Sequence, residues 1–156
     1  MTLCAYFHIG LLVPDIAAAR DHYGATFEVD FTTVTAVEYD VAVPDTGELY
    51  HRVSHVCFSR GEPPYYELLQ VGAYGLFGPD ELGRVHHVGV WTPDAVATQA
   101  LLSSRGVRTE AEVRTPEGRT RAWYSDPADA FGIRYEFLDT TRREWMERYI
   151  ATGTAG

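Results

Sequence analysis

The stretches HIGLLVPD at residues 8–15 and HVGVWTPD at residues 87–94 read almost alike. Their His, Gly, Pro and Asp positions coincide, and apolar residues fill most of the places between them. Each stretch predicts an apolar strand followed by a helix, because Pro is tolerated in the first helical turn and Asp suits the positive end of the helix dipole. A repeat over this distance predicts two copies of one structural unit.

A second echo lies downstream in each copy, where YELL at residues 66–69 resembles YEFL at residues 135–138. The two echoes have offsets of 79 and 69 residues, so the first copy is ten residues longer, and the turn-rich segment 43–48 is the candidate insertion. Apolar alternation and turn residues predict the order βαβββ twice. The predicted strands are 5–13, 28–39, 51–60 and 65–72 in module one (about 5–72), and 85–91, 107–114, 119–125 and 133–139 in module two (about 84–139). A C-terminal helix is predicted over about residues 140–150.

The composition excludes several classes of protein. The chain has 156 residues with a formal net charge of −9, so a basic footprint for nucleic acid is absent. All 13 basic residues are Arg, which excludes a Lys Schiff base. No apolar run approaches the ~18 residues of a membrane span. Cys4 and Cys57 are too few for a disulfide framework, so we expect a reduced cytoplasmic protein that binds neither nucleic acid nor membrane.

One His and one Glu recur at equivalent places: His8 and His87 on the first strand of each module, Glu67 and Glu136 on the last. A lone His or Glu in a strand is usually packed or solvated, but an unpaired buried carboxylate is costly and needs a partner. A pseudo-twofold relation between the modules would bring all four together, and the pattern predicts one bound divalent metal ion. His86 alternates to the other face, so it is interpreted as structural or exposed.

The stretches FHIGLLVPD, YYELLQ and VHHVGVWTPD, together with Asp126-Pro127, Gly132 and Glu136, resemble the vicinal oxygen chelate superfamily. That superfamily includes glyoxalase I, methylmalonyl-CoA epimerase, extradiol dioxygenases and bleomycin-resistance proteins. The resemblance covers about residues 5–139. It implies a single α+β domain over residues 1–156, in which two βαβββ modules form an open, curled mixed β-barrel with flanking helices. It also places the metal inside the barrel, bound by the first and last strands of each module.

The ligand set His8, Glu67, His87 and Glu136 is most similar to those of glyoxalase I and methylmalonyl-CoA epimerase. The resemblance implies a metal-dependent epimerase, isomerase or glyoxalase-like lyase that moves a proton α to a carbonyl, with Glu136 as the base and Glu67 opposite. Zn, Co, Ni, Mn and Fe all accept such a donor set. Two alternatives stay open: an Fe(II) ring-cleaving dioxygenase, and a small-molecule binding or resistance protein without chemistry.

Five further residues are candidates for substrate contacts. Tyr65 and Arg134 should share a face with the two Glu ligands, and Tyr6, Trp91 and Trp123 would line an apolar or aromatic pocket. Plain packing is the alternative for each of them.

The substrate is expected to be a small organic molecule of unknown identity. A coenzyme A substrate would favour a basic cluster around the mouth of the site, whereas the arginines are scattered along the sequence. Two-module chains of the superfamily that this sequence resembles usually dimerise. We therefore expect a homodimer with Trp145 and Tyr149 of the last helix as possible contacts.

Overall fold

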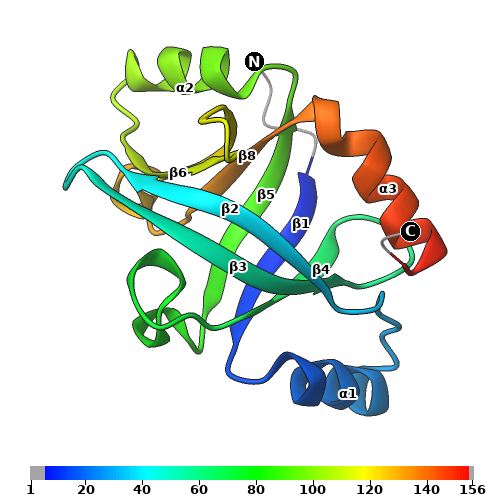
Figure 1. Cartoon of the computed structure of the whole chain (residues 1–156). Coiled ribbons are helices and arrows are strands. Elements are labelled where there is room, and N and C mark those ends of the chain that lie inside the picture. The colour runs from blue at the N-terminus through cyan, green and yellow to red at the C-terminus, as the bar shows by residue number, and fades with distance from the viewer. Residues whose placement is uncertain (1–5, 155–156) are drawn as a thin grey trace.

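The computed structural model describes residues 6–154, so Cys4 and residue 5 of the first predicted strand lie outside the described residues. Figure 1 shows a β-barrel flanked by helices. Module one comprises β1 (Tyr6–Val13), α1 (Ile16–Phe27), β2 (Thr35–Val43), β3 (Glu48–Phe58) and β4 (Tyr65–Gln70). Module two comprises β5 (Val85–Thr92), α2 (Ala95–Ser103), β6 (Thr109–Arg114), β7 (Thr120–Ser125) and β8 (Tyr135–Asp139). The final helix is α3 (Arg143–Thr152).

The repeated Pro-Asp pair begins a helix in both modules, as expected. The carboxylate of Asp15 accepts the backbone N–H of Ala18 at 2.9 Å, and Asp94 does the same for Ala97 at 2.8 Å. Each Asp thereby satisfies one N–H that the first helical turn would otherwise leave unpaired. The two strand-to-helix transitions are therefore equivalent in the two modules.

The barrel closes, and the expectation of an open one is wrong in this respect. The strand order is β1-β4-β3-β2-β6-β7-β8-β5, and β5 returns to pair with β1. The second join is antiparallel, with Val41 of β2 opposite Val113 of β6. The predicted strand 28–39 ended before this contact, whereas β2 continues to Val43 and reaches β6. The C-terminal part of β2, residues 40–42, is therefore what closes the sheet.

The ten additional residues of module one do not form an inserted loop. Within the segment 43–48, residues 44–47 form a short turn between β2 and β3, and these strands have 9 and 11 residues. Their counterparts β6 and β7 have 6 residues each. Most of the extra length therefore extends the β2–β3 hairpin, which forms part of the barrel wall and is the long ribbon in front in Figure 1.

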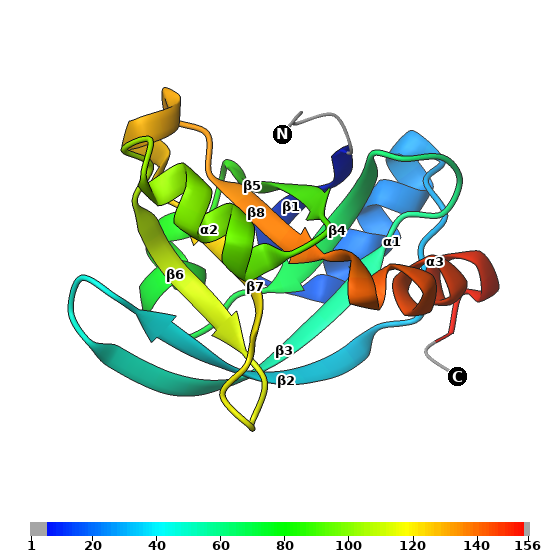
Figure 2. The same cartoon turned by 90° about the horizontal axis from the view of Figure 1, so that it is seen from above.

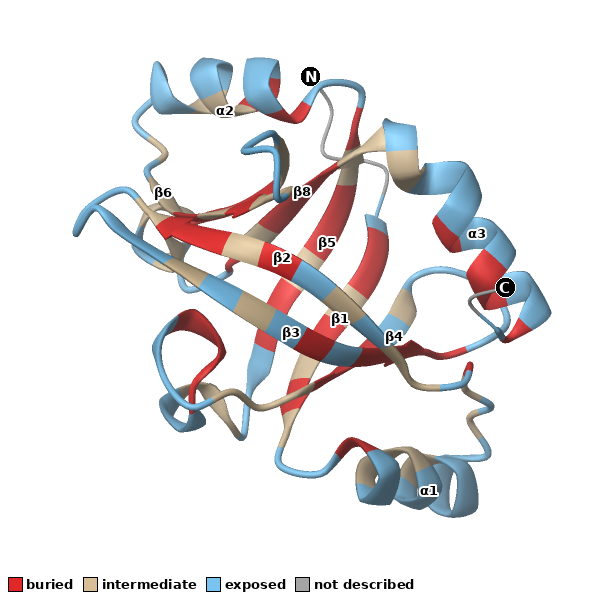
Figure 3. Cartoon of the chain, viewed as in Figure 1, coloured by how far each residue is buried: buried red, intermediate tan, exposed pale blue. Residues whose placement is uncertain are grey.

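Helices α1 and α2 pack against different sides of the barrel (Figure 2). Buried residues concentrate on the strands, while the outer helix surfaces are exposed (Figure 3). Helix α3 packs on the barrel through Met146, Tyr149 and Ile150. Tyr149 is buried and its hydroxyl donates to the carbonyl of Thr33, so it is not available as a dimer contact, whereas Trp145 is 38% exposed. No helix among residues 6–154 is long and apolar enough to cross a membrane.

Candidate metal centre

The strand register places the four predicted ligands around two glycines. Gly10 of β1 pairs with a residue on each neighbouring strand, and so does Gly89 of β5. The two resulting rows across the sheet are Glu67–Gly10–His87 and His8–Gly89–Glu136. Because residues opposite one another in a sheet share a face, all four ionisable side chains enter the same interior.

The glycine in each His-x-Gly sequence makes room for the histidine of the other module. A Cβ on Gly10 would overlap the imidazole ring of His87, and a Cβ on Gly89 would overlap that of His8. Both contacts would be closer than side-chain carbons come to ring atoms in folded proteins. The repeated glycine is therefore a steric requirement of the two crossing histidines.

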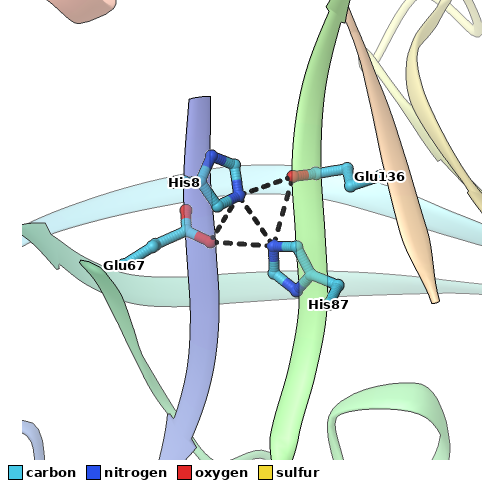
Figure 4. A group of neighbouring side chains, drawn as sticks. All are labelled: His8, Glu67, His87 and Glu136. Carbon is cyan, nitrogen blue, oxygen red and sulfur yellow. Dashed lines mark hydrogen bonds and ion pairs between the residues drawn. The ribbon is translucent and has the colours of Figure 1, made fainter. Parts of the chain in front are cut away.

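The four side chains converge on one point (Figure 4). The Nε2 atoms of His8 and His87 lie 2.8 Å apart. The Oε2 atom of Glu67 lies 3.3 Å from His8 Nε2 and 3.1 Å from His87 Nε2, and Oε2 of Glu136 lies 3.1 and 3.3 Å from the same two atoms. All four residues are buried, and one ligand atom from each lies within 4.8 Å of the others.

This group needs a positive charge. Burial lowers the pKa of His87, but the charge and hydrogen bond of Glu136, and then those of Glu67, outweigh it and raise the pKa to about 9. Burial raises the pKa of Glu136, yet His87 and then His8 hold it well below its ordinary range. The buried Oε2 atom of Glu67 faces both imidazoles, and no other group among residues 6–154 donates a hydrogen bond to it. Two imidazole nitrogens and two carboxylates with these properties fit a divalent cation, which replaces protons at such sites.

The tautomer of His87 follows from a chain of hydrogen bonds. Nε2 of His86 lies 2.7 Å from the carbonyl oxygen of Leu76, which can only accept, so His86 carries its proton on Nε2. Burial is the main cause that lowers the pKa of His86, to about 3, so its Nδ1 is an acceptor. That atom lies 2.8 Å from Nδ1 of His87, which must donate. The Nε2 lone pair of neutral His87 then faces the centre.

Two β-bulges in the β1–β5 ladder explain why strand alternation predicted neither the His86–His87 contact nor the exposure of Tyr6. The register shifts between Tyr6 and His8 and again at His86, so Phe7 and His86 are extra residues in their strands. His86 therefore turns inward beside His87, against the expected alternation. Tyr6, expected in the pocket, is instead 49% exposed.

Trp123 and Trp91 do not line the site either. Trp123 pairs with Phe137 in the β7–β8 ladder and stacks on it at 4.3 Å between ring centroids, in the cluster that also contains Ala95 of α2. It therefore lies on the outer face of the sheet. Trp91 is half-buried and packs against Phe7, with ring centroids 4.5 Å apart. Both residues make packing contacts, and a role for either in substrate binding stays a prediction.

Arg134 and Tyr65 have structural contacts away from the four ligands. Arg134 is buried and forms ion pairs with Glu81 at 2.9 Å and with Glu110 at 2.5 Å. It lies just before β8, two residues ahead of Glu136, and is not among the residues that line the cavity described below. Tyr65 packs edge-on against Phe7. Alternation along a strand predicts which face of the sheet a side chain lies on. The position of the residue along the strand then decides whether the side chain reaches the four ligands.

Tyr124 is the neighbour that the sequence reasoning overlooked. Its hydroxyl donates to Oε1 of Glu136 at 2.8 Å, and the two residues are direct partners in the β7–β8 ladder. Burial and the charge of Glu136 raise its pKa, so the hydroxyl stays protonated and can donate. Alternation along β7 could have indicated this contact, because Tyr124 must point into the barrel once its neighbour Trp123 is assigned to the outer face.

A cavity of about 90 Å³ lies beside the four ligands, and both Glu67 and Glu136 line it. Most of its wall is apolar or aromatic and comes from the barrel strands and from α3. Representative wall residues are Tyr39, Phe58, Leu69, Leu138, Met146 and Tyr149. The arrangement places two buried carboxylates in the wall of a mainly apolar cavity.

Comparison with known proteins agrees with this architecture. The model of the glyoxalase/bleomycin resistance protein/dioxygenase superfamily matches residues 7–124, and the chain belongs to this superfamily. No curated protein matches the chain.

Several solved structures share the fold. A variant of methylmalonyl-CoA epimerase from Streptomyces coelicolor, in complex with 2-nitronate-propionyl-CoA, has a TM-score of 0.62 at 20% identity. The match covers 88% of this chain and 98% of that one. The epimerase from Mycobacterium tuberculosis has a TM-score of 0.53 at 17% identity, with coverages of 89% and 92%. A hypothetical protein of Bacillus halodurans C-125 has a TM-score of 0.61 at 18% identity, with coverages of 86% and 92%.

Proposed function

We propose that this chain is a divalent-metal-dependent enzyme that transfers a proton α to a carbonyl of a small organic substrate. His8, Glu67, His87 and Glu136 are the proposed ligands. The observation that supports this most is their convergence, buried and within 4.8 Å, beside a cavity that both carboxylates line. A bound divalent ion would polarise the substrate carbonyl and so acidify the neighbouring C–H bond.

The two carboxylates are the proposed proton carriers. Glu136 is the base, and Glu67, which comes from the other module, acts opposite it. The Tyr124 hydroxyl positions Glu136 through Oε1, whereas no such donor contacts Glu67 among the described residues. Two carboxylates on different strands could remove a proton from one side of a carbon and return it on another, which is what an epimerase requires.

The alternatives fit these contacts less well. A two-His, one-carboxylate oxygenase leaves three positions open on its iron, whereas here two carboxylates face the same pair of imidazoles. A protein that only binds small molecules has no need for four buried ionisable residues, which cost free energy unless a cation compensates them. We therefore favour the epimerase, isomerase or glyoxalase-like lyase class over both.

Metal analysis and isotope exchange test the proposal together. Protein prepared without chelator should hold about one Zn, Co, Ni, Mn or Fe ion per chain, and His8→Ala should lose it. Metal-loaded wild type, offered acyl thioesters, hemithioacetals and cyclic ketones in heavy water, should incorporate deuterium α to the carbonyl of a ligand it binds. Oxygen consumption without exchange would instead indicate the oxygenase, and saturable binding without either reaction would indicate the binding protein.

Matched variants separate the roles of the carboxylates from metal binding. Glu136→Gln and Glu67→Gln should each retain much of the metal and lose about two to four orders of magnitude in exchange rate, the usual range for a general base. Glu144→Gln is the control, because the Glu144 side chain is 87% exposed on α3, where it pairs with Arg148. Full exchange activity in both glutamine variants would contradict the assignment.

We also propose that the chain forms a homodimer. Its exposed apolar residues include Trp145 on α3. Light scattering at micromolar concentration tests this, and a monomer mass would contradict it.

A further inference from the structure

Three arginines gather where the cavity meets the surface. Arg121 and Arg142 line the cavity that also contains Glu67 and Glu136. The same two arginines, together with Arg119, border a shallow surface depression next to it. The expectation that the arginines are scattered is therefore wrong for this part of the fold. The β7 strand and the segment before α3 bring together residues that are separated in the sequence.

A bulge in β7 turns Arg121 toward the cavity. In the β6–β7 ladder, Thr120 pairs with Arg114 and Ala122 pairs with Val113, which leaves Arg121 as an extra residue in its strand. A bulge re-aims a side chain that regular alternation would send to the other face.

Arg142 reaches the cavity from the short segment Thr140–Arg142 that precedes α3. Its guanidinium lies over the ring of Trp145, 5.0 Å from the centroid, which restricts where the charged group can go. Both side chains are half-buried, so each has lost part of its hydration.

These arginines have no acidic partner in the part of the chain that the structure describes. No ion pair joins Arg119, Arg121 or Arg142 to a carboxylate among residues 6–154, whereas the buried Arg134 has two. Asp139 borders the same cavity, but its carboxylate accepts the backbone N–H groups of Thr141 at 2.9 Å and Ala95 at 3.3 Å.

The electrostatics of Arg121 favour the binding of an anion. Burial lowers the pKa of Arg121, and only Tyr39 and the exposed Glu117 act in the opposite direction. The guanidinium has therefore lost part of its hydration without forming an ion pair with a carboxylate in the described part of the chain. In a chain of net charge −9, a group of unpaired cations beside the candidate active site is unexpected unless it has a ligand.

We propose that the substrate carries an oxyanion, a carboxylate or a phosphate, on an apolar body, and that Arg121 and Arg142 bind this oxyanion at the mouth. The apolar body lies against Leu138 and Met146, with the reacting end toward Glu136. This inference rests on the proposed function and names the class of substrate for that site. Guanidinium groups suit it because their planar donors match both kinds of oxyanion.

Binding of simple probes to zinc-loaded protein tests the inference without turnover. Phenylacetate and phenyl phosphate carry the two oxyanions on the same ring, and phenylacetamide is the neutral counterpart. Calorimetric titration should show at least one oxyanion binding about tenfold or more tightly than the amide. Arg121→Gln and Arg142→Gln should each remove most of that advantage. Arg143→Gln is the control. It removes one positive charge from α3, where Arg143 pairs with Glu147, and should keep the tighter binding of the oxyanion.

A carboxylate could instead bind the metal, and the variants separate the two sites. Affinity that is lost in His8→Ala but unchanged in both arginine variants would place the anion on the metal and overturn the inference. Equal affinity for all three probes would overturn it as well. Metal content and thermal unfolding are measured for each variant, and two independent arginine variants keep the test decisive if one fails to fold. Oxyanion binding at the arginines without any deuterium exchange would contradict the proposed function while the inference stands.

Discussion

Nδ1 of His86 lies 2.8 Å from Nδ1 of His87, so the orientation of one histidine of the candidate centre is set by its neighbour in the chain. His86 is in turn anchored by the carbonyl of Leu76. A carbonyl, a neutral histidine and a second histidine thus form one chain of hydrogen bonds that ends at the centre. Among residues 6–154, His8 has no corresponding support, because its buried Nδ1 atom has no hydrogen-bond partner there.

Replacing His86 should weaken metal binding without removing a ligand. We expect His86→Ala to lose about 10–100-fold in affinity for Zn²⁺, the usual cost of losing a group that orients a ligand. Competition with a chromogenic chelator measures this. His22→Ala, which removes an exposed histidine of α1, is the control and should leave the affinity unchanged. Unchanged affinity in His86→Ala would show that His87 needs no orienting partner.

A methyl group at either repeated glycine should disturb the opposite histidine. Gly10→Ala should displace His87 and Gly89→Ala should displace His8, because each Cβ would overlap the facing ring. We expect each variant to lose more than about tenfold in metal affinity, as packed interiors cannot absorb such an overlap without moving the ring. Gly24→Ala is the control, since its Cβ would meet only a backbone oxygen at 3.6 Å. Metal titration beside thermal unfolding distinguishes displacement of a ligand from loss of the fold.

The hydroxyl of Tyr124 should matter for proton transfer more than for metal content. Tyr124→Phe removes the hydrogen bond to Oε1 of Glu136 and leaves the ring in place. Because a hydrogen bond to a charged group contributes about 1.5–3 kcal/mol, we expect a loss of about tenfold or more in exchange rate, with the metal retained. Tyr65→Phe, away from the cavity, should be neutral. An unchanged rate in Tyr124→Phe would show that Glu136 is positioned without it.

Stability of the metal-free protein should depend on pH through His87. Its pKa rises from 6.5 to about 9 on folding, so the folded state holds this proton more tightly than the unfolded chain. The stabilisation is therefore complete below about pH 6.5 and is lost as the pH rises through about 9. Denaturant unfolding should show the decline in metal-free wild type and not in His87→Ala. Metal-loaded protein should lack it, because the ion replaces the proton.

Features that follow from the repeat could be predicted from the sequence alone. The two βαβββ orders and the helix starts at Asp15 and Asp94 are confirmed, because alternation and capping depend on residues close in the chain. The structure also brings His8, Glu67, His87 and Glu136 together, although their role as metal ligands stays a prediction. Equivalent positions in two related modules meet at the axis that relates them, so a repeated pair of residues predicts one site.

Only the tertiary structure decided which other side chains face that site. The bulges at Phe7, His86 and Arg121 each insert one residue into a strand, and such an extra residue changes the face of nearby side chains such as Tyr6, His86 and Arg121. A bulge depends on the hydrogen-bond register between strands that are distant in sequence, so the local pattern does not contain it. The same holds for the β2–β6 join that closes the barrel and for the approach of Arg142 to Arg121. The repeat is a local property of the chain, whereas the lining of the cavity is a property of strands that meet only after folding.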